Sequence, residues 1–391
     1  MHEEQRLNTI ISLAQSYQFE KPLVLFLRNC FRAHRNMGSR DRKIVTQSVY
    51  SLFRLGKSFS SQPLPEQIAI GLFLCSKEAD AFTSWCIQNK STLSPENISA
   101  PLKEKLKELQ SVYPAFSLEN IFPFKKYLSA EIDFEEYVSS LLNKPAVFIR
   151  IRKKFKPAVL KELSEKNISF RPIEETNAVE ILSSAQLEEL SFFKKGYFEI
   201  QDLSSQKTGN YLTLSPQSYW WDACAGSGGK SLLLYDKENS IKIFATDSRE
   251  KSLLNLRERF KRAGIKNYKT KVLDLEKETM HFGEMFDGII VDAPCSGSGT
   301  WARSPEQLSS FNEKMIEAYA EKQKKIVQNV LKNLQKNAPL IYITCSVFTK
   351  ENEENIKYFS EALGLYAEAS AYIKGYGMGA GTLFVSKLVK K

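Results

Sequence analysis

The stretch DACAGSGGK, residues 222–230, decides the fold class of this chain of 391 residues. Residues 218–222 form an apolar run that predicts a strand, and the stretch begins at the end of this run. A helix is expected to follow the glycines of the stretch. In an open α/β sheet, ligands lie beyond the carboxyl ends of the strands, where Gly-rich turns let the backbone come close. The stretch therefore predicts the ligand-binding turn of a doubly wound sheet.

Strands and helices alternate around this turn with the period of an α/β domain. The sequence predicts a Rossmann-like domain over residues 201–391. The strand candidates are 218–222, 241–246, 269–273, 286–291, 339–344 and 382–389, and helices fit 248–263 and 312–334.

Residues 1–142 are predicted to form a separate helical domain, because apolar residues recur there at helical spacing. Ser39 is expected to cap a helix that opens with the run 39–42. The Lys-rich segment 102–110 predicts another amphipathic helix, and residues 114–123 a connection.

Residues 143–200 show short, mixed patterns that predict a small α/β, RRM-like module. Strands are expected at 147–152 and 178–182, with a helix at 157–166. The basic run 150–156 could follow a phosphate backbone or could guard a solvated strand edge.

The composition is that of an ordinary soluble protein with a basic balance. Lys and Arg total 55 against 45 Asp and Glu, which gives a net charge of +10 and favours a polyanionic partner. No stretch approaches the roughly 20 uninterrupted apolar residues of a membrane span, and the N-terminus lacks the apolar core of a signal peptide. Six scattered cysteines and three His predict reduced thiols and no metal. We expect a cytoplasmic monomer.

Carboxylates at the ends of two further strands complete a predicted cofactor site. Asp247, about 20 residues beyond the glycines, is placed to accept both ribose hydroxyls, and Asp274 could receive an adenine amino group. Free amides of the helix after the turn suit the carboxylate of a methionine-like ligand. Enzymes that bind dinucleotides share this pattern. The sequence lacks a second phosphate-binding signature and contains two thiol motifs, so S-adenosylmethionine is favoured over a dinucleotide as the cofactor. The predicted cofactor residues are Asp222, Ala223, Cys224, Ala225, Gly226, Ser227, Gly228, Gly229, Lys230, Asp247, Asp274 and Asp292, with Cys224 more suited to packing than to chemistry.

Two cysteines follow the fourth and fifth predicted strands, Cys295 in DAPC (292–295) and Cys345 in TCS (344–346). Both should therefore lie over one face of the cofactor pocket. Carbon 5 of cytosine is too poor a nucleophile to attack a methyl sulfonium, so a thiolate must first add to carbon 6. A second thiol beside the first can assist its release. The pattern predicts methylation of cytosine carbon 5 in RNA.

Several long motifs, in order, resemble those of Sun/RsmB-type RNA cytosine-5 methyltransferases, from about Val147 onward. The N-terminal runs 39–42 and 49–54 are similar, over a shorter match, to the NusB-like RNA-binding domain of the bacterial branch that modifies small-subunit ribosomal RNA. Arg40 and Arg42 could instead pair with Asp41 or other neighbours. The matching motifs are 201–206, 222–231, 292–299, 303–306, 344–346 and 351–355.

The resemblance implies roles for the site residues. Cys345 should attack carbon 6 and Cys295 should assist release, whereas DNA cytosine-5 methyltransferases use the Pro-Cys thiol as nucleophile. Asp292 should hold the pyrimidine edge, and Lys230 could touch the base or lower a thiol pKa.

The chain departs from the family pattern at two places. Gly226-Ser227 stands where Ala-Pro is usual, and GTLF at 381–384 lacks the acid of the family's Asp-Gly-Phe-Phe. Transfer RNA is an alternative substrate, since the catalytic motifs are shared. A non-catalytic RNA-binding assembly factor is a second alternative, which the retained thiols and acids argue against.

Overall fold

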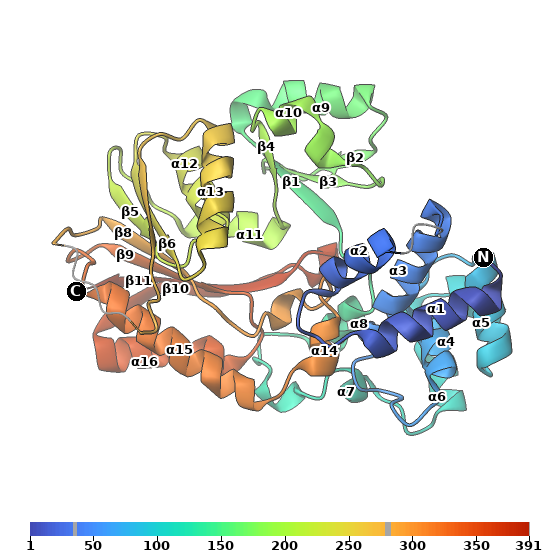
Figure 1. The fold of residues 1–391 in the computed structure, drawn as a ribbon. Coiled ribbons are helices and arrows are strands. Elements are labelled where there is room, and N and C mark those ends of the chain that lie inside the picture. The colour runs from blue at the N-terminus through green and yellow to red at the C-terminus, as the bar shows by residue number, and fades with distance from the viewer. Residues whose placement is uncertain (34–36, 278–282, 391) are drawn as a thin grey trace. The chain divides into compact units, whose positions relative to one another are not determined.

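The computed structural model describes residues 1–33, 37–277 and 283–390 (Figure 1). The chain forms two compact units, Met1–Lys144 with Trp301–Glu313, and Pro145–Thr300 with Lys314–Lys391. Within the described ranges, no helix is long and apolar enough to cross a membrane.

The first unit is helical, as predicted. Its central helix, α4, is apolar on nearly every side, and such a helix must be buried among others. The helices are α1 (Glu3–Ser16), α2 (Leu23–Ala33), α3 (Ser39–Arg54), α4 (Leu64–Cys75), α5 (Ala81–Lys90), α6 (Leu102–Val112), α7 (Leu118–Ile121), α8 (Phe134–Leu141) and α14 (Glu306–Ser310).

The structure corrects one local prediction in this unit and adds detail to two others. Ser39 does not cap α3: Gly38 is the N-cap, and its carbonyl oxygen accepts the first helical hydrogen bond from the Arg42 N–H. Asp41 does not pair with Arg40 or Arg42, because it accepts two hydrogen bonds from Arg6, 2.7 and 3.0 Å long. The connection 114–123 contains the short helix α7.

Residues 301–313 belong to this helical unit although they follow the Cys295 loop in the chain. The Leu23 N–H donates to Glu306 Oε1 (3.1 Å), and Arg54 donates to the Ala302 carbonyl (2.8 Å). The domain boundaries at 142 and 200 stay predictions.

The second unit begins with a small βαββαβ module, which has the predicted RRM-like arrangement. Its antiparallel sheet has the order β2-β3-β1-β4. Two of its strands and α10 were not predicted from the sequence, because each has only three or four residues. The elements are β1 (Val147–Ile151), α9 (Lys156–Glu165), β2 (Phe170–Pro172), β3 (Ala178–Ile181), α10 (Ser191–Lys194) and β4 (Phe198–Ile200).

The basic run 150–156 does not guard a strand edge, because β1 lies inside the small sheet. The Arg150 Nε donates to Gln201 Oε1 (2.6 Å), and its guanidinium also pairs with Asp236. Arg152 Nε donates to Asp236 Oδ1 (2.9 Å). Both arginines of the run are therefore engaged inside the unit rather than open to a phosphate backbone.

The large sheet has seven strands in the order β10-β11-β9-β8-β5-β6-β7. The five strands from β9 to β7 are parallel, and β11 runs antiparallel to both neighbours. This topology confirms the predicted Rossmann-like fold class. The strands are β5 (Tyr219–Asp222), β6 (Lys242–Asp247), β7 (Tyr268–Val272), β8 (Gly288–Asp292), β9 (Pro339–Thr344), β10 (Leu365–Lys374) and β11 (Thr382–Lys390).

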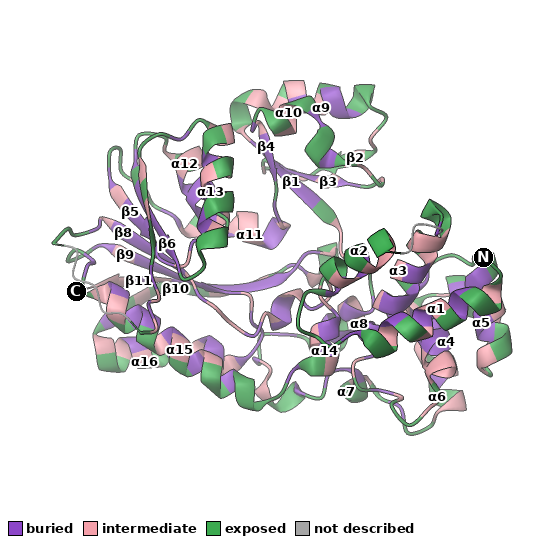
Figure 2. Cartoon of the chain, in the orientation of Figure 1, coloured by how far each residue is buried: buried purple, intermediate pink, exposed green. Residues whose placement is uncertain are grey.

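Helices cover both faces of the large sheet (Figure 1): α12 (Gly229–Lys237) and α13 (Glu250–Ala263) on one, α15 (Lys314–Leu331) and α16 (Glu353–Leu363) on the other. The central strands β5, β8 and β9 are buried along nearly their whole length (Figure 2). Strand β10 was not predicted. It lies at the sheet edge and is mostly exposed, so its sequence lacks a clear apolar pattern.

Candidate active site

A cavity of about 460 Å³ lies beyond the carboxyl ends of four parallel strands, β5 to β8. Its wall is formed by the residues that directly follow these strands and by one side of α15. The volume is in the range of small-molecule sites. The lining residues are Ala223, Cys224, Asp247, Ser248, Arg249, Leu273, Asp274, Leu275, Glu276, Asp292, Pro294, Cys295, Tyr319, Lys322 and Ile326.

The Gly-rich turn leads from the cavity-lining residues Ala223 and Cys224 into α12. Gly228 has φ +84°, and a Cβ there would lie 2.9 Å from Leu256 Cγ, so the position requires glycine. Asp247 holds the turn from β6: its Oδ2 accepts from the Gly226 N–H (2.9 Å), and its Oδ1 accepts from the Arg249 N–H (2.9 Å).

Asp222, at the end of β5, is completely buried beneath the turn and does not line the cavity. Its Oδ2 accepts from Ser231 Oγ (2.6 Å), while Oδ1 has no hydrogen-bond partner in the described part of the chain. Burial raises the pKa of Asp222 to about 7, and the nearby Asp292 carboxylate adds to the shift. Asp222 therefore joins β5 to α12.

Asp274 follows β7 and also lines the cavity. The pKa of Asp274 lies below its ordinary value. Burial alone would raise this pKa, but hydrogen bonds from the Glu276 N–H (3.1 Å) and from Lys277 stabilise the carboxylate and have the larger combined effect. The side chain can thus present a carboxylate acceptor to a ligand.

The two predicted cysteines lie in contact, with their Sγ atoms 3.1 Å apart. The Cys345 N–H also donates to Cys295 Sγ (3.3 Å). Cys295 lines the cavity, whereas Cys345 lies next to it and is not part of the wall. The hydrogen bond with Cys345 and burial raise the pKa of Cys295 well above that of a free thiol.

A buried carboxylate, Glu351, joins the loops that carry the two cysteines. Its Oε2 accepts from the Ser296 N–H (2.9 Å) and from Gln323 Nε2 (2.8 Å), and its Oε1 accepts from Ser346 Oγ (2.6 Å). Burial raises its pKa. No role for this residue was predicted from the sequence, although it opens the motif 351–355 that follows Cys345.

Lys230 and Asp292 form an ion pair beside the cavity. Lys230 Nζ lies 3.0 Å from Asp292 Oδ2 and 2.9 Å from Ser205 Oγ. Lys230 is buried, whereas Asp292 lines the cavity. The motif 201–206 thus reaches this pair through Ser205, which the sequence did not single out.

The predicted site residues therefore divide into two sets. The first set lines the cavity and the second is not part of its wall. The wall contains Ala223, Cys224, Asp247, Asp274, Asp292 and Cys295, and the residues outside it are Asp222, Ala225, Gly226, Ser227, Gly228, Gly229, Lys230 and Cys345. Ser248, Arg249, Tyr319 and Lys322 line the cavity without having been predicted.

The site of the missing family acid is close to another carboxylate. The Gly381 N–H donates to Asp202 Oδ2 (3.0 Å), and Asp202 Oδ1 accepts from the Ser204 N–H (2.9 Å). The C-terminal strand is thereby tied to the motif 201–206.

Two solved structures share the fold. A crystal structure of PH0851 superposes over 100% of this chain and 99% of its own, with a TM-score of 0.75 and 21% identity. The structure of NSun6 from Pyrococcus horikoshii with SFG covers 70% of this chain and 96% of its own, with a TM-score of 0.60 and 19% identity.

Sequence relatives match about half of the chain. A tRNA (cytosine(72)-C(5))-methyltransferase of Pyrococcus horikoshii is 33% identical over 194 residues, covering 49% of each chain. A ribosomal RNA small subunit methyltransferase B of Vibrio vulnificus is 30% identical over 189 residues, 48% of this chain and 44% of its own. The chain spans about half the length of the curated relatives it matches.

The family model for the 16S rRNA methyltransferase RsmB/F matches residues 210–369, which contain the Gly-rich turn, both cysteines and Glu351. The sheet order and the cavity at its carboxyl edge agree with that match. Over these residues the chain is similar to the RsmB/F methyltransferases.

Proposed function

We propose that the chain methylates carbon 5 of a cytidine in RNA, with S-adenosylmethionine as methyl donor and small-subunit ribosomal RNA as substrate. The observation that carries this proposal is the pair of thiols, 3.1 Å apart, at a cavity whose wall also holds four carboxylates, Asp247, Asp274, Glu276 and Asp292. The family match supports the same reaction.

The cofactor fits the residues present. The cavity of about 460 Å³ is lined by carboxylates and by Ala223 and Cys224 of the Gly-rich turn, and its Asp247 accepts a hydrogen bond from the Gly226 N–H. Asp247 would receive the ribose hydroxyls and Asp274 the adenine amino group. When bound, S-adenosylmethionine supplies an electrophilic methyl group. The neighbouring structure solved with SFG, an analogue of this cofactor, supports the assignment.

Cys345 acts as the nucleophile. Its thiolate bonds to carbon 6 of the cytosine, and the electron pair of the ring double bond becomes available at carbon 5 for the methyl group. The hydrogen of carbon 5 then leaves as a proton, its electron pair restores the double bond, and the Cys345 thiolate is expelled. Cys295, in contact with Cys345, assists this release.

Asp292 orients the base from the cavity wall. It accepts from the exocyclic amine of cytosine or, when protonated, donates to ring nitrogen 3. Lys230 holds the Asp292 carboxylate in place through the 3.0 Å contact. A base inside a helix hides carbon 6, so the target cytidine lies in a loop or is flipped out.

Small-subunit ribosomal RNA is the substrate we favour, because the family model and several curated relatives carry that description. Transfer RNA is the second candidate, since another relative is named a tRNA cytosine-5 methyltransferase. The deciding experiment measures transfer of labelled methyl groups to separated 16S, 23S and transfer RNA from cells lacking the gene, followed by bisulfite mapping. One protected cytidine in 16S RNA is the expected result, and incorporation only into transfer RNA overturns the choice of substrate.

A non-catalytic assembly factor is distinguished by cofactor binding. A ligand at 100 times its dissociation constant adds about 2.7 kcal/mol to stability, so S-adenosylmethionine should raise the melting temperature. Absence of any shift, together with no methyl transfer, would contradict the proposed reaction.

A further inference from the structure

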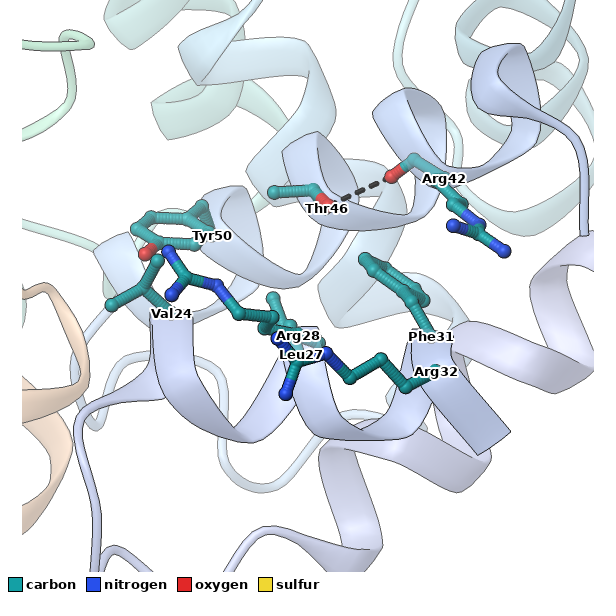
Figure 3. A pocket seen from close by; sticks show the side chains of 8 residues that line it. All are labelled: Val24, Leu27, Arg28, Phe31, Arg32, Arg42, Thr46 and Tyr50. Atoms are coloured by element: carbon teal, nitrogen blue, oxygen red, sulfur yellow. Dashed lines mark hydrogen bonds between the residues drawn. The ribbon is translucent and has the colours of Figure 1, made fainter. Parts of the chain in front are cut away.

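A second pocket, of about 450 Å³, lies within the helical unit between α2 and α3 (Figure 3). Helix α2 contributes Arg28 and Arg32, which are four residues apart and so lie on one side of the helix. Helix α3 contributes Arg42 to the same pocket. The lining residues are Val24, Leu27, Arg28, Phe31, Arg32, Arg42, Thr46 and Tyr50.

The charge of this pocket is positive and unbalanced. None of the described residues that line it is a carboxylate, and α2 contains no acidic residue. Among the described residues, no ion pair joins Arg28, Arg32 or Arg42 to a carboxylate, and Asp41, the acid nearest in sequence to Arg42, is bound to Arg6 instead. Three positively charged side chains around one pocket favour an anionic ligand.

Arg42 carries a further sign of a missing partner. Its Nε is buried and finds no hydrogen-bond acceptor among the residues that the structure describes. Its guanidinium lies 6.0 Å from the centre of the Phe31 ring, so an aromatic face supports the charge. A buried donor without an acceptor costs free energy, which an incoming oxygen would recover.

The walls between the arginines are apolar and aromatic. Phe31 and Tyr50 are both partly buried and both line the pocket, with Val24 exposed at its rim. Bases of single-stranded RNA stack on aromatic rings and on arginine planes, while phosphates take charge-assisted hydrogen bonds. This combination distinguishes a nucleotide from a simple inorganic anion.

We propose that the pocket binds a single-stranded segment of the substrate RNA, with Arg28 and Arg32 on phosphates, one base against Phe31 beside Arg42, and a neighbouring base against Tyr50 at the other end of the pocket. This inference rests on the proposed function, because that reaction makes RNA the polyanion which the chain meets. The pocket gives the helical unit an RNA contact of its own, separate from the cavity that takes the cytidine.

The test uses the full chain and a fluorescein-labelled single-stranded oligoribonucleotide, with binding measured by anisotropy over a range of salt. The variants are Arg28→Ala/Arg32→Ala and Arg42→Lys, which keeps the charge but loses the planar fork. The control is Lys103→Ala/Lys107→Ala on α6, which removes the same charge from exposed positions of the same unit. Circular dichroism melting shows whether each variant is folded.

The double arginine variant should bind RNA about tenfold or more weakly. Its slope of log affinity against log salt should be smaller by about 1.4, the value for two phosphates of a single strand. Arg42→Lys should weaken RNA binding with little change of slope, because it removes a hydrogen-bonding plane and no charge. The control pair should keep wild-type affinity to within about twofold.

Three outcomes would overturn the inference. One is the same loss of affinity in the control and arginine variants, and another is no loss in either. The third is a glutamate oligomer that displaces the RNA and depends equally on the arginines, which would make the site a peptide site.

Methyl transfer is measured in parallel, so that this inference and the proposed function fail separately. If the arginine variants lose RNA binding but the wild-type chain transfers no methyl group, the proposed RNA pocket is supported and the proposed reaction is wrong. If the arginine variants transfer methyl groups with wild-type kinetics, the proposed reaction is supported and the proposed RNA pocket is wrong.

Discussion

The Sγ atoms of Cys295 and Cys345 lie 3.1 Å apart, although fifty residues separate them in the chain. They meet because β8 and β9 are adjacent parallel strands and each cysteine follows the carboxyl end of its strand. Glu351 then holds the two loops together from beneath. Two thiols in contact can share the work of attack and release, which one thiol would have to do alone.

Removal of Cys345 and removal of Cys295 should have different effects on the reaction. Cys345→Ala should abolish methyl transfer, because no group remains to attack carbon 6. Cys295→Ala should accumulate a covalent protein–RNA adduct, since addition proceeds and release stalls. Denaturing gels of each variant incubated with RNA and S-adenosylmethionine distinguish them. An adduct from Cys345→Ala, and none from Cys295→Ala, would reverse the two roles.

Glu351→Gln should lower kcat by roughly ten- to a hundredfold while leaving the KM for RNA unchanged, because small displacements of reacting groups are costly. The variant loses charge-assisted hydrogen bonds to Ser296, Gln323 and Ser346, so the free energy of unfolding should fall by about 1–3 kcal/mol. Glu354→Gln, an exposed acid three residues on, is the matched control. An equal effect in both variants would argue against a positioning role.

Asp222 should make the chain less stable as the pH rises from about 4 to 7. Its pKa is about 7 when folded and 3.8 as the ordinary value, so over this interval the folded state keeps a proton that the unfolded chain releases. The stabilisation is complete below 3.8 and is lost as the pH rises through the folded value. Urea unfolding at several pH values should show this loss in the wild-type chain and a flatter profile in Asp222→Asn. Identical profiles would contradict the assignment.

Gly228→Ala should destabilise the chain by about 2–4 kcal/mol. A side chain at positive φ costs about 1–2 kcal/mol, and the new Cβ would also press on Leu256 and Phe260. Gly264→Ala is the control, since that glycine has φ +74° but no atom within 4 Å of a built Cβ. Thermal unfolding of both variants separates the backbone cost from the contact. Similar losses would show that the contact with α13 is unimportant.

The turn at 222–230 and the six strands of the large sheet predicted from sequence are local features. Their apolar periodicity, their glycines and the acids at strand ends are set by neighbours a few residues apart, so they can be read along the chain. The same holds for most helices of the first unit. Strands β2 and β4 were not predicted, because a strand of three residues is too short to show an alternating apolar pattern. Strand β10 was not predicted because it lies at the sheet edge and much of it is exposed.

Long-range contacts were decided by the tertiary structure alone. The sequence placed both cysteines near one pocket, but their contact, the linking role of Glu351 and the pairing of Lys230 with Asp292 depend on which strands are neighbours. The assignment of residues 301–313 to the helical unit has the same origin. So do the burial of Arg150 against Asp236 and the unbalanced arginines between α2 and α3. Such contacts join residues tens to hundreds of positions apart, and burial of surface in the folded chain, rather than any local preference, determines them.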